Sequence, residues 1–127
     1  IKVKSRQELI DDTLASIREY LERAVPEIDK LVDQFYQEVN QNTWQKFAQL
    51  MEGLQFIVDT LQVIDINKDW YHNAVQFVQV SEKLRRQIVM LQEALESKDR
   101  VWLSDVLLYE ITPSFQALNR AIAAITM

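Results

Sequence analysis

Histidine and carboxylate side chains are the groups in this sequence that could do chemistry. Metal-dependent enzymes built on helical bundles carry Glu and His three residues apart on two helices, with these side chains directed inward. This chain has a single histidine, His72, and no Glu stands three residues before it. Because His72 follows Trp70 and Tyr71 near a predicted helix start, we expect it at the surface or at a helix end.

Glu52 and Glu110 are the carboxylates that come closest to an inward-facing pair. Each stands eight residues after a tryptophan that opens a predicted helix, Trp44 or Trp102. If the two helices belong to a duplicated hairpin and lie side by side, the two carboxylates could share a proton or bind a cation. A carboxylate metal enzyme is therefore one hypothesis. Ordinary exposure, or a salt bridge to Lys or Arg, is the alternative that we expect.

The composition excludes several other chemistries. The chain contains no cysteine, which removes disulfides, thiolate metal sites and Cys nucleophiles and suits a reducing cytoplasm. The single glycine leaves no loop that could cradle a phosphate, and no nucleophile turn of the type G-x-S-x-G is present. The sequence therefore indicates a non-enzymatic protein without a catalytic residue, a metal ion or a cofactor.

Charge and hydropathy narrow the class of partner. The net charge is −5 and the basic residues are scattered, which disfavours nucleic acid as a partner because clustered Lys and Arg bind a phosphate backbone. No apolar run approaches the ~20 residues of a membrane span, and none has the form of a signal peptide. We therefore expect a cytoplasmic protein without membrane insertion. Since the chain starts at Ile1 and not at Met, we also expect that a start residue or short segment has been removed.

Apolar residues recur at helical spacing along nearly the whole chain. Polar breaks at 40–43, 65–69 and 97–99 delimit four predicted helices, and one Gly and two Pro are too few for a turn-rich β fold. The predicted N-caps are Ser5, in a capping box with Glu8, for the first helix, Asn42 or Thr43 for the second, and Asn67 or Asp69 for the third. Connections of three to five residues place successive helices antiparallel. The predicted fold is all-α: one domain over residues 1–127, folded as an antiparallel up-down four-helix bundle.

Two prolines interrupt the first and last predicted helices. A proline removes one backbone hydrogen bond, and its ring clashes with the carbonyl four residues back. We expect the first helix to be kinked or split near Pro26 and the last helix to be kinked near Pro113. Two facing kinks would leave a pocket lined by residues such as Phe35, Phe77 and Phe115. This is the basis of an alternative function, a bundle that binds a small molecule or a lipid.

Two segments carry more apolar surface than a bundle core requires. On the second helix, a second seam contains a glycine, which costs about 1 kcal/mol in a helix interior, so we expect another backbone to approach closely there. On the fourth helix, a ridge beside the core face is covered either by the first helix or by another protein, most simply in a C2 homodimer. The predicted interaction residues are Gly53, Phe56, Thr60 and Val63 on the second helix and Trp102, Val106 and Tyr109 on the fourth.

The stretch WLSDVLLYEITP at 102–113 resembles small helical proteins of Firmicutes bacteria whose function is uncharacterised. The likeness covers most of the chain and implies a bacterial cytoplasmic protein, but it carries no functional residues with it. More loosely, the architecture is similar to that of small bundle chaperones and adaptors of bacterial secretion and flagellar systems. We therefore predict an interaction module (an adaptor, regulator or chaperone-like bundle) that binds a protein helix or a second copy of itself.

Overall fold

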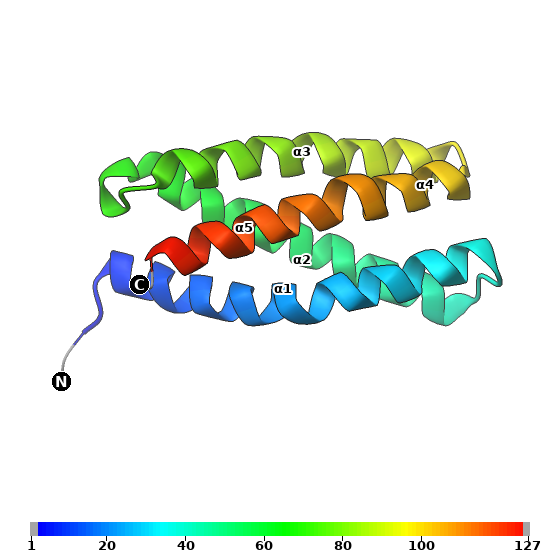
Figure 1. The fold of residues 1–127 in the computed structure, drawn as a ribbon, viewed down its shortest axis with the longest axis horizontal. Coiled ribbons are helices and arrows are strands. Elements are labelled where there is room, and N and C mark those ends of the chain that lie inside the picture. Colours follow the sequence, from blue (N-terminus) through cyan, green and yellow to red (C-terminus); the bar gives the residue numbers. More distant parts are fainter. Residues whose placement is uncertain (1–2, 126–127) are drawn as a thin grey trace.

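The computed structural model describes residues 3–125, and every regular element among them is helical (Figure 1). The elements in chain order are α1 (Arg6–Tyr36), α2 (Gln41–Ile66), the 3₁₀ turn η1 (Lys68–Trp70), α3 (Ala74–Glu96), α4 (Arg100–Val106), the π-helical turn η2 (Leu107–Ile111) and α5 (Thr112–Ile125). Because α4, η2 and α5 follow one another without a loop, they form one rod. The prediction of an all-α fold with four long helices is confirmed.

Side-chain contacts define the relative directions of the helices. Tyr20 of α1 lies against Gly53 of α2, whereas Phe35, near the end of α1, packs on Phe47, near the start of α2. These two helices therefore run in opposite directions. Figure 1 shows the same alternation for α3 and for the rod that contains α4 and α5, which lies between α1 and α3 in this view.

Side-chain caps set the starts of the first two helices. Ser5 and Glu8 form a capping box at the start of α1, as the sequence predicts. A second capping box opens α2: the backbone N–H of Thr43 donates to the side chain of Asn40 at 3.1 Å, and the backbone N–H of Asn40 donates to the hydroxyl of Thr43 at 3.3 Å. The prediction that Asn42 or Thr43 is the N-cap is therefore wrong, because Asn40 and Thr43 satisfy each other's backbone groups.

The connection between α2 and α3 is longer than the sequence suggests. The sequence predicts Asn67 or Asp69 as the N-cap of the third helix, but a 3₁₀ turn intervenes, α3 begins at Ala74 and its N-cap is Asn73. Tyr71 lies in this connection and is buried, and its hydroxyl donates a hydrogen bond to the carboxylate of Asp11 on α1. The bond fastens the connection to the start of the first helix.

Buried tyrosines make the stability of the fold sensitive to alkaline pH. Burial, with the hydrogen bond and charge of Asp11, raises the pKa of Tyr71 above its usual value, and burial also raises the pKa of Tyr20. Because the folded chain disfavours the phenolate, this stabilisation is present below about pH 10 and is lost as the pH rises above it. In urea denaturation, we expect the free energy of unfolding to fall as the pH rises above about 10, and to fall less in Tyr71→Phe. Equal slopes for the two proteins would contradict this assignment.

α1 continues through Pro26 as one helix of 31 residues, so of the two predicted alternatives, a kinked or a split helix, the split is excluded. Pro26 itself is exposed, while Ala24 and Ile28, on either side of it, are buried in the core. The apolar stripe keeps its phase across the proline, so burial on both sides holds the helix together despite one missing hydrogen bond.

The last rod changes its hydrogen-bond pattern immediately before Pro113. The N–H of Thr112 donates to the carbonyl of Leu107, five residues back, and the hydroxyl of Thr112 donates to the same oxygen at 3.2 Å. Such a π-helical turn widens the helix by one residue. Pro113 has no N–H and needs room for its ring, and the wider turn provides that room. The sequence predicts a kink at this position, and a π-helical turn is the feature that it did not predict.

The core is continuous along the bundle, with buried apolar residues from every long helix in one cluster. The phenylalanines that were expected to line a pocket, Phe35, Phe77 and Phe115, are at most 3% exposed. Their ring contacts are with Phe47, Tyr71 and Tyr20, respectively. The expectation that they line a pocket is therefore wrong, because neighbouring aromatic rings occupy the space beside them.

The connection between α3 and α4 contains a residue with positive φ, Lys98 at 55°. The N–H groups of Lys98 and Asp99 donate to the carbonyls of Leu95 and Ala94, which is the pattern of a Schellman motif. Glycine occupies this backbone region without the steric cost of a Cβ. We expect Lys98→Gly to raise the free energy of unfolding by about 1 kcal/mol in urea denaturation, and Lys98→Ala to leave it nearly unchanged. An equal effect of the two changes would contradict the prediction.

Candidate functional site

The predicted seam on α2 does not form one exposed surface. Phe56 is 56% exposed, Gly53 and Val63 are half-buried, and Thr60 is buried, with its hydroxyl donating to the carbonyl of Phe56 at 3.0 Å. The close approach at Gly53 is real, but the partner is the side chain of Tyr20 on α1. A Cβ added to Gly53 would lie 2.8 Å from Cζ of that ring. The expectation of another backbone at this point is wrong, because an aromatic ring of the same fold fills the notch.

The predicted ridge on the fourth helix is also divided between surface and interior. Val106 is 2% exposed, Trp102 is half-buried and packs on the core cluster, and Tyr109 is 67% exposed. α1 packs against both α4 and η2, so the first helix covers part of this ridge. Of the two alternatives for the ridge, a contact within the chain explains the burial of Val106. Tyr109 is the ridge residue that the structure leaves most open to a partner.

The carboxylates that were considered for a metal site are exposed. Glu52 is exposed on α2 and Glu110 is exposed on η2, and His72 is exposed in the connection before α3. Within residues 3–125, no group of three or more His, Cys, Asp or Glu side chains could hold a metal ion. The buried convergence of Glu52 and Glu110 that the metal-enzyme hypothesis requires is therefore not found.

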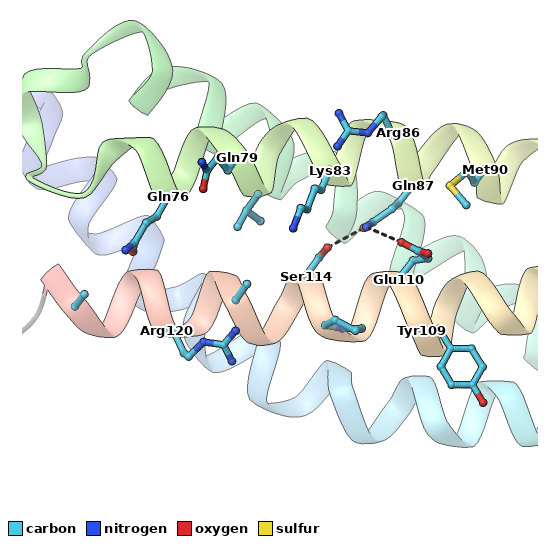
Figure 2. A pocket seen from close by; sticks show the side chains of 14 residues that line it. Gln76, Gln79, Lys83, Arg86, Gln87, Met90, Tyr109, Glu110, Ser114 and Arg120 are labelled. Carbon is cyan, nitrogen blue, oxygen red and sulfur yellow. Dashed lines mark hydrogen bonds between the residues drawn. The ribbon is translucent and has the colours of Figure 1, made fainter.

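A groove of about 820 Å³ runs between α3 and the rod formed by η2 and α5 (Figure 2). Its apolar lining consists of Val80, Met90, Pro113, Ala117 and Ala124, and its polar lining includes Gln76, Gln79 and Tyr109. The volume is within the range of natural ligand sites. The small side chains on α5 leave room for an occupant to approach the backbone of that helix.

Three basic side chains line this groove: Lys83 and Arg86 on α3 and Arg120 on α5. In Figure 2, Lys83 extends across the gap towards α5, whereas Arg86 and Arg120 lie at the outer margins. Within the part of the chain that the structure describes, none of the three makes a hydrogen bond or an ion pair. A protein with a net charge of −5 therefore carries a groove with three cations that have no anionic partner.

A polar network crosses the groove where the π-helical turn meets α5 (Figure 2). The hydroxyl of Ser114 donates to Oε1 of Gln87 at 3.0 Å, and Nε2 of Gln87 makes a long hydrogen bond of 3.5 Å to Oε2 of Glu110. Gln87 and Ser114 are each 5% exposed. Buried polar side chains are costly unless they are paired, so this network fixes the relative positions of α3 and the last rod. Glu110 is the acidic side chain of the groove.

Sequence reasoning missed most residues of this groove. Of the seven predicted interaction residues, Tyr109 is the one that lines it. Gln87 offered a signal, since it stands among the apolar core positions of its helix and a polar residue there needs partners. Lys83 and Arg86, three residues apart, predict one basic helix edge. The sequence does not show that Arg120 lies on the opposite margin, because that depends on how the two helices pair.

A second groove, of about 720 Å³, lies between α1 and α2 at Pro26. Its apolar lining includes Ala24, Ile28 and Leu50, and Lys46 is one of its basic residues. Pro26 cannot donate the hydrogen bond that the carbonyl of Glu22, four residues back, would otherwise accept.

Within the described residues, no helix combines the length and the apolarity that a membrane span requires.

Comparison with known proteins places the chain in a family. The family described as "Domain of unknown function (DUF8042)" matches residues 12–121, which extend from the first turns of α1 into α5 and include the groove as far as Arg120. No curated protein and no solved structure matches the chain. Since the match covers most of the sequence, the chain belongs to the DUF8042 family.

Proposed function

We propose that this protein is a non-enzymatic interaction module that binds an acidic amphipathic helix of another protein in the groove between α3 and α5. The observation that carries the proposal is a groove that combines apolar side chains with three cations, Lys83, Arg86 and Arg120, for which the described residues supply no ion-pair partner. An amphipathic helix in a hydrophobic groove is a recurrent mode of peptide recognition. Carboxylates along the edges of such a helix would pair with the basic margins.

The dimensions of the groove support a helical occupant. On α3 the lining extends from Gln76 to Met90, a rise of roughly 21 Å at 1.5 Å per residue. This length corresponds to about four helical turns. Ser114, Ala117 and Ala124 present small side chains on α5, so that a fifth helix could pack at the usual interaxial distance of about 8–10 Å.

The charge distribution favours a different protein over a second copy of this chain. A C2 dimer centred on the groove would bring the three cations of one copy opposite those of the other, and like charges across an interface are costly. An acidic partner would instead be repelled by the negative remainder of the surface and attracted to the groove. We further propose a bacterial cytoplasmic setting, which the resemblance to Firmicutes proteins and the absence of cysteine support.

Substitutions of the adjacent arginines of α3 test this proposal with a matched control. The probe is a synthetic amphipathic peptide of about 16 residues with an apolar stripe and glutamates on its edges. We expect Arg86→Ala to weaken its binding roughly two- to fivefold in isothermal titration calorimetry, because one exposed charge pair is lost. Arg85→Ala is the control, since Arg85 hydrogen bonds Gln62 of α2 on another face of the helix. No binding to the wild-type protein, or equal losses in both variants, would count against the proposal.

The second candidate function is the binding of a small amphiphile in the groove at Pro26. The observation that favours it is the groove itself, which lies beside Pro26 and has apolar and basic side chains in its lining. A fatty acid would place its chain on the apolar lining and its carboxylate near Lys46. The groove is open to solvent along one side of α1 and α2, so it would cover less of a ligand than an enclosed cavity would. For this reason the groove between α3 and α5 is the preferred site.

A further inference from the structure

The basic and acidic groups of the groove between α3 and α5 are separated along its length, and we infer that they fix the direction of the bound helix. Its N-terminal end would lie at Glu110 and its C-terminal end at Arg120. This inference rests on the proposed function, and it adds the polarity and the charge order of the partner segment. It identifies the partner segment as a helix with acidic residues in its C-terminal half and a basic residue in its N-terminal half.

The charge separation follows from the antiparallel packing of α3 and α5. The side-chain amide of Asn73 donates to the carbonyl of Ala121, and Gln87 pairs with Ser114, so the start of α3 lies beside the end of α5. Arg120 therefore lies towards the start of α3. Glu110 lies ten residues earlier on the rod, a rise of about 15 Å. Figure 2 shows the same order, with Arg120 and Gln76 at one end and Glu110, Met90 and Tyr109 at the other.

Lys83 lies between the two ends of this separation, and Arg86 offsets it only in part. Lys83 lies between the two ends, and its side chain extends across the gap, where it would meet the middle or the C-terminal half of an occupant (Figure 2). Arg86 is nearer to Glu110 along the axis, but its side chain points to the outer margin in this view. A carboxylate lying in the groove would thus meet Arg120 at one end, Lys83 near the middle and the carboxylate of Glu110 at the other end.

The dipole of the bound helix favours this direction, and the direction in turn decides where the acidic side chains of the partner must lie. A helix carries roughly half a positive charge at its N-terminus and half a negative charge at its C-terminus. The N-terminus is therefore stabilised near Glu110 and the C-terminus near Arg120 and Lys83. Acidic side chains in the C-terminal half pair with the same two cations. The bound helix would lie parallel to α5 and antiparallel to α3. It would pack against both as a fifth helix of the bundle.

The predicted charge order is opposite to the order that stabilises an isolated helix. Free helices gain stability from acidic residues near the N-terminus and basic residues near the C-terminus. A peptide with acidic residues in its C-terminal half should therefore be the poorer helix in solution. If it nevertheless binds more tightly than its reversed counterpart, the preference must come from the groove. This makes the comparison of the two peptides a demanding test.

The experiment compares two peptides of about 16 residues that share one apolar stripe, one composition and one covalent staple. The first has glutamates in the C-terminal half and a lysine in the N-terminal half, and the second has the reverse order. Circular dichroism verifies that both are helical. We expect the first to bind the wild-type protein roughly five- to tenfold more tightly. We expect Lys83→Glu combined with Glu110→Lys to abolish or reverse this preference.

The outcomes separate the inference from the proposed function on which it rests. If neither peptide binds, the proposed function itself is wrong. If both bind with equal affinity, or the reversed peptide binds more tightly, the groove accepts a helix but the inferred direction is wrong.

A second experiment measures the direction by cross-linking. Because the chain has no cysteine, a Gln79→Cys variant can report which end of the peptide lies near position 79. Gln79 is exposed at the Arg120 end of the groove, so with an added thiol oxidant a peptide with a C-terminal cysteine should form a disulfide faster than one with an N-terminal cysteine. The opposite rates would overturn the direction.

Discussion

Replacing Lys83, Arg86 and Arg120 together by Glu is expected to weaken the binding of an acidic helical peptide by roughly a hundredfold or more. Each substitution removes one attraction and adds one repulsion, with a combined effect of about 1 kcal/mol per site at a surface. Three sites sum to about 3 kcal/mol, and 1.4 kcal/mol is a factor of ten in affinity. Most of the loss should appear in the association rate and should shrink as salt is added.

The matched control is Lys68, Arg85 and Arg100 replaced together by Glu, which changes the net charge by the same amount. These three residues are exposed, and none of them lines the groove. We expect this control to lose only a few-fold in affinity, through the more negative field of the whole protein. Calorimetry and stopped-flow fluorescence measure the two effects. Similar losses in both triple variants would mean that net charge, and not the groove, governs binding.

Gly53→Ala is expected to lower the free energy of unfolding by about 1–3 kcal/mol, although alanine is the better helix former. The added Cβ would overlap the phenol group of Tyr20. The ring of Tyr20 packs edge-to-face on Phe115, with ring centroids 6.3 Å apart, so moving the ring away would break this contact. The cost of overpacking therefore exceeds the gain in helix propensity of about 1 kcal/mol.

A change of sign in a second background tests this explanation. In Tyr20→Leu, the phenol group is absent, so Gly53→Ala should raise the free energy of unfolding by up to about 1 kcal/mol. Ala48→Gly, at an exposed position of the same helix, calibrates the propensity effect. Urea denaturation of the four members of the double-mutant cycle measures the coupling. If Gly53→Ala destabilises both backgrounds equally, Tyr20 is not the cause.

The sequence predicted the number and type of the helices because apolar residues at helical spacing report directly on one buried face. It also located the cap at Ser5, where the pattern of a capping box is local. It did not identify Asn40 as the N-cap of α2, since several polar residues in one break can cap a helix. The π-helical turn before Pro113 was missed because the sequence shows that a hydrogen bond is lost but not how the backbone adjusts.

The candidate site was harder to predict, because a pattern on one helix does not show which neighbour covers it. Thr60 was predicted to contact a partner, and Val106 to be covered by either the first helix or another protein, but the packing of the bundle itself buries both. Gly53 correctly indicated a close approach, yet the approaching group is a side chain of α1. Lys83 and Arg120 line the same groove because α3 and α5 pack antiparallel. The sequence of either helix alone does not show this pairing.

The most direct test of the central claim is a titration of ¹⁵N-labelled protein with the acidic helical peptide, followed by backbone amide chemical shifts. The binding account predicts the largest shift changes at Lys83, Gln87, Ser114 and Ala117, which line the groove between α3 and α5. A parallel titration with a fatty acid examines the groove at Pro26. Peptide-induced changes that are confined to α1 and α2, or that are absent at saturating peptide, would contradict the account.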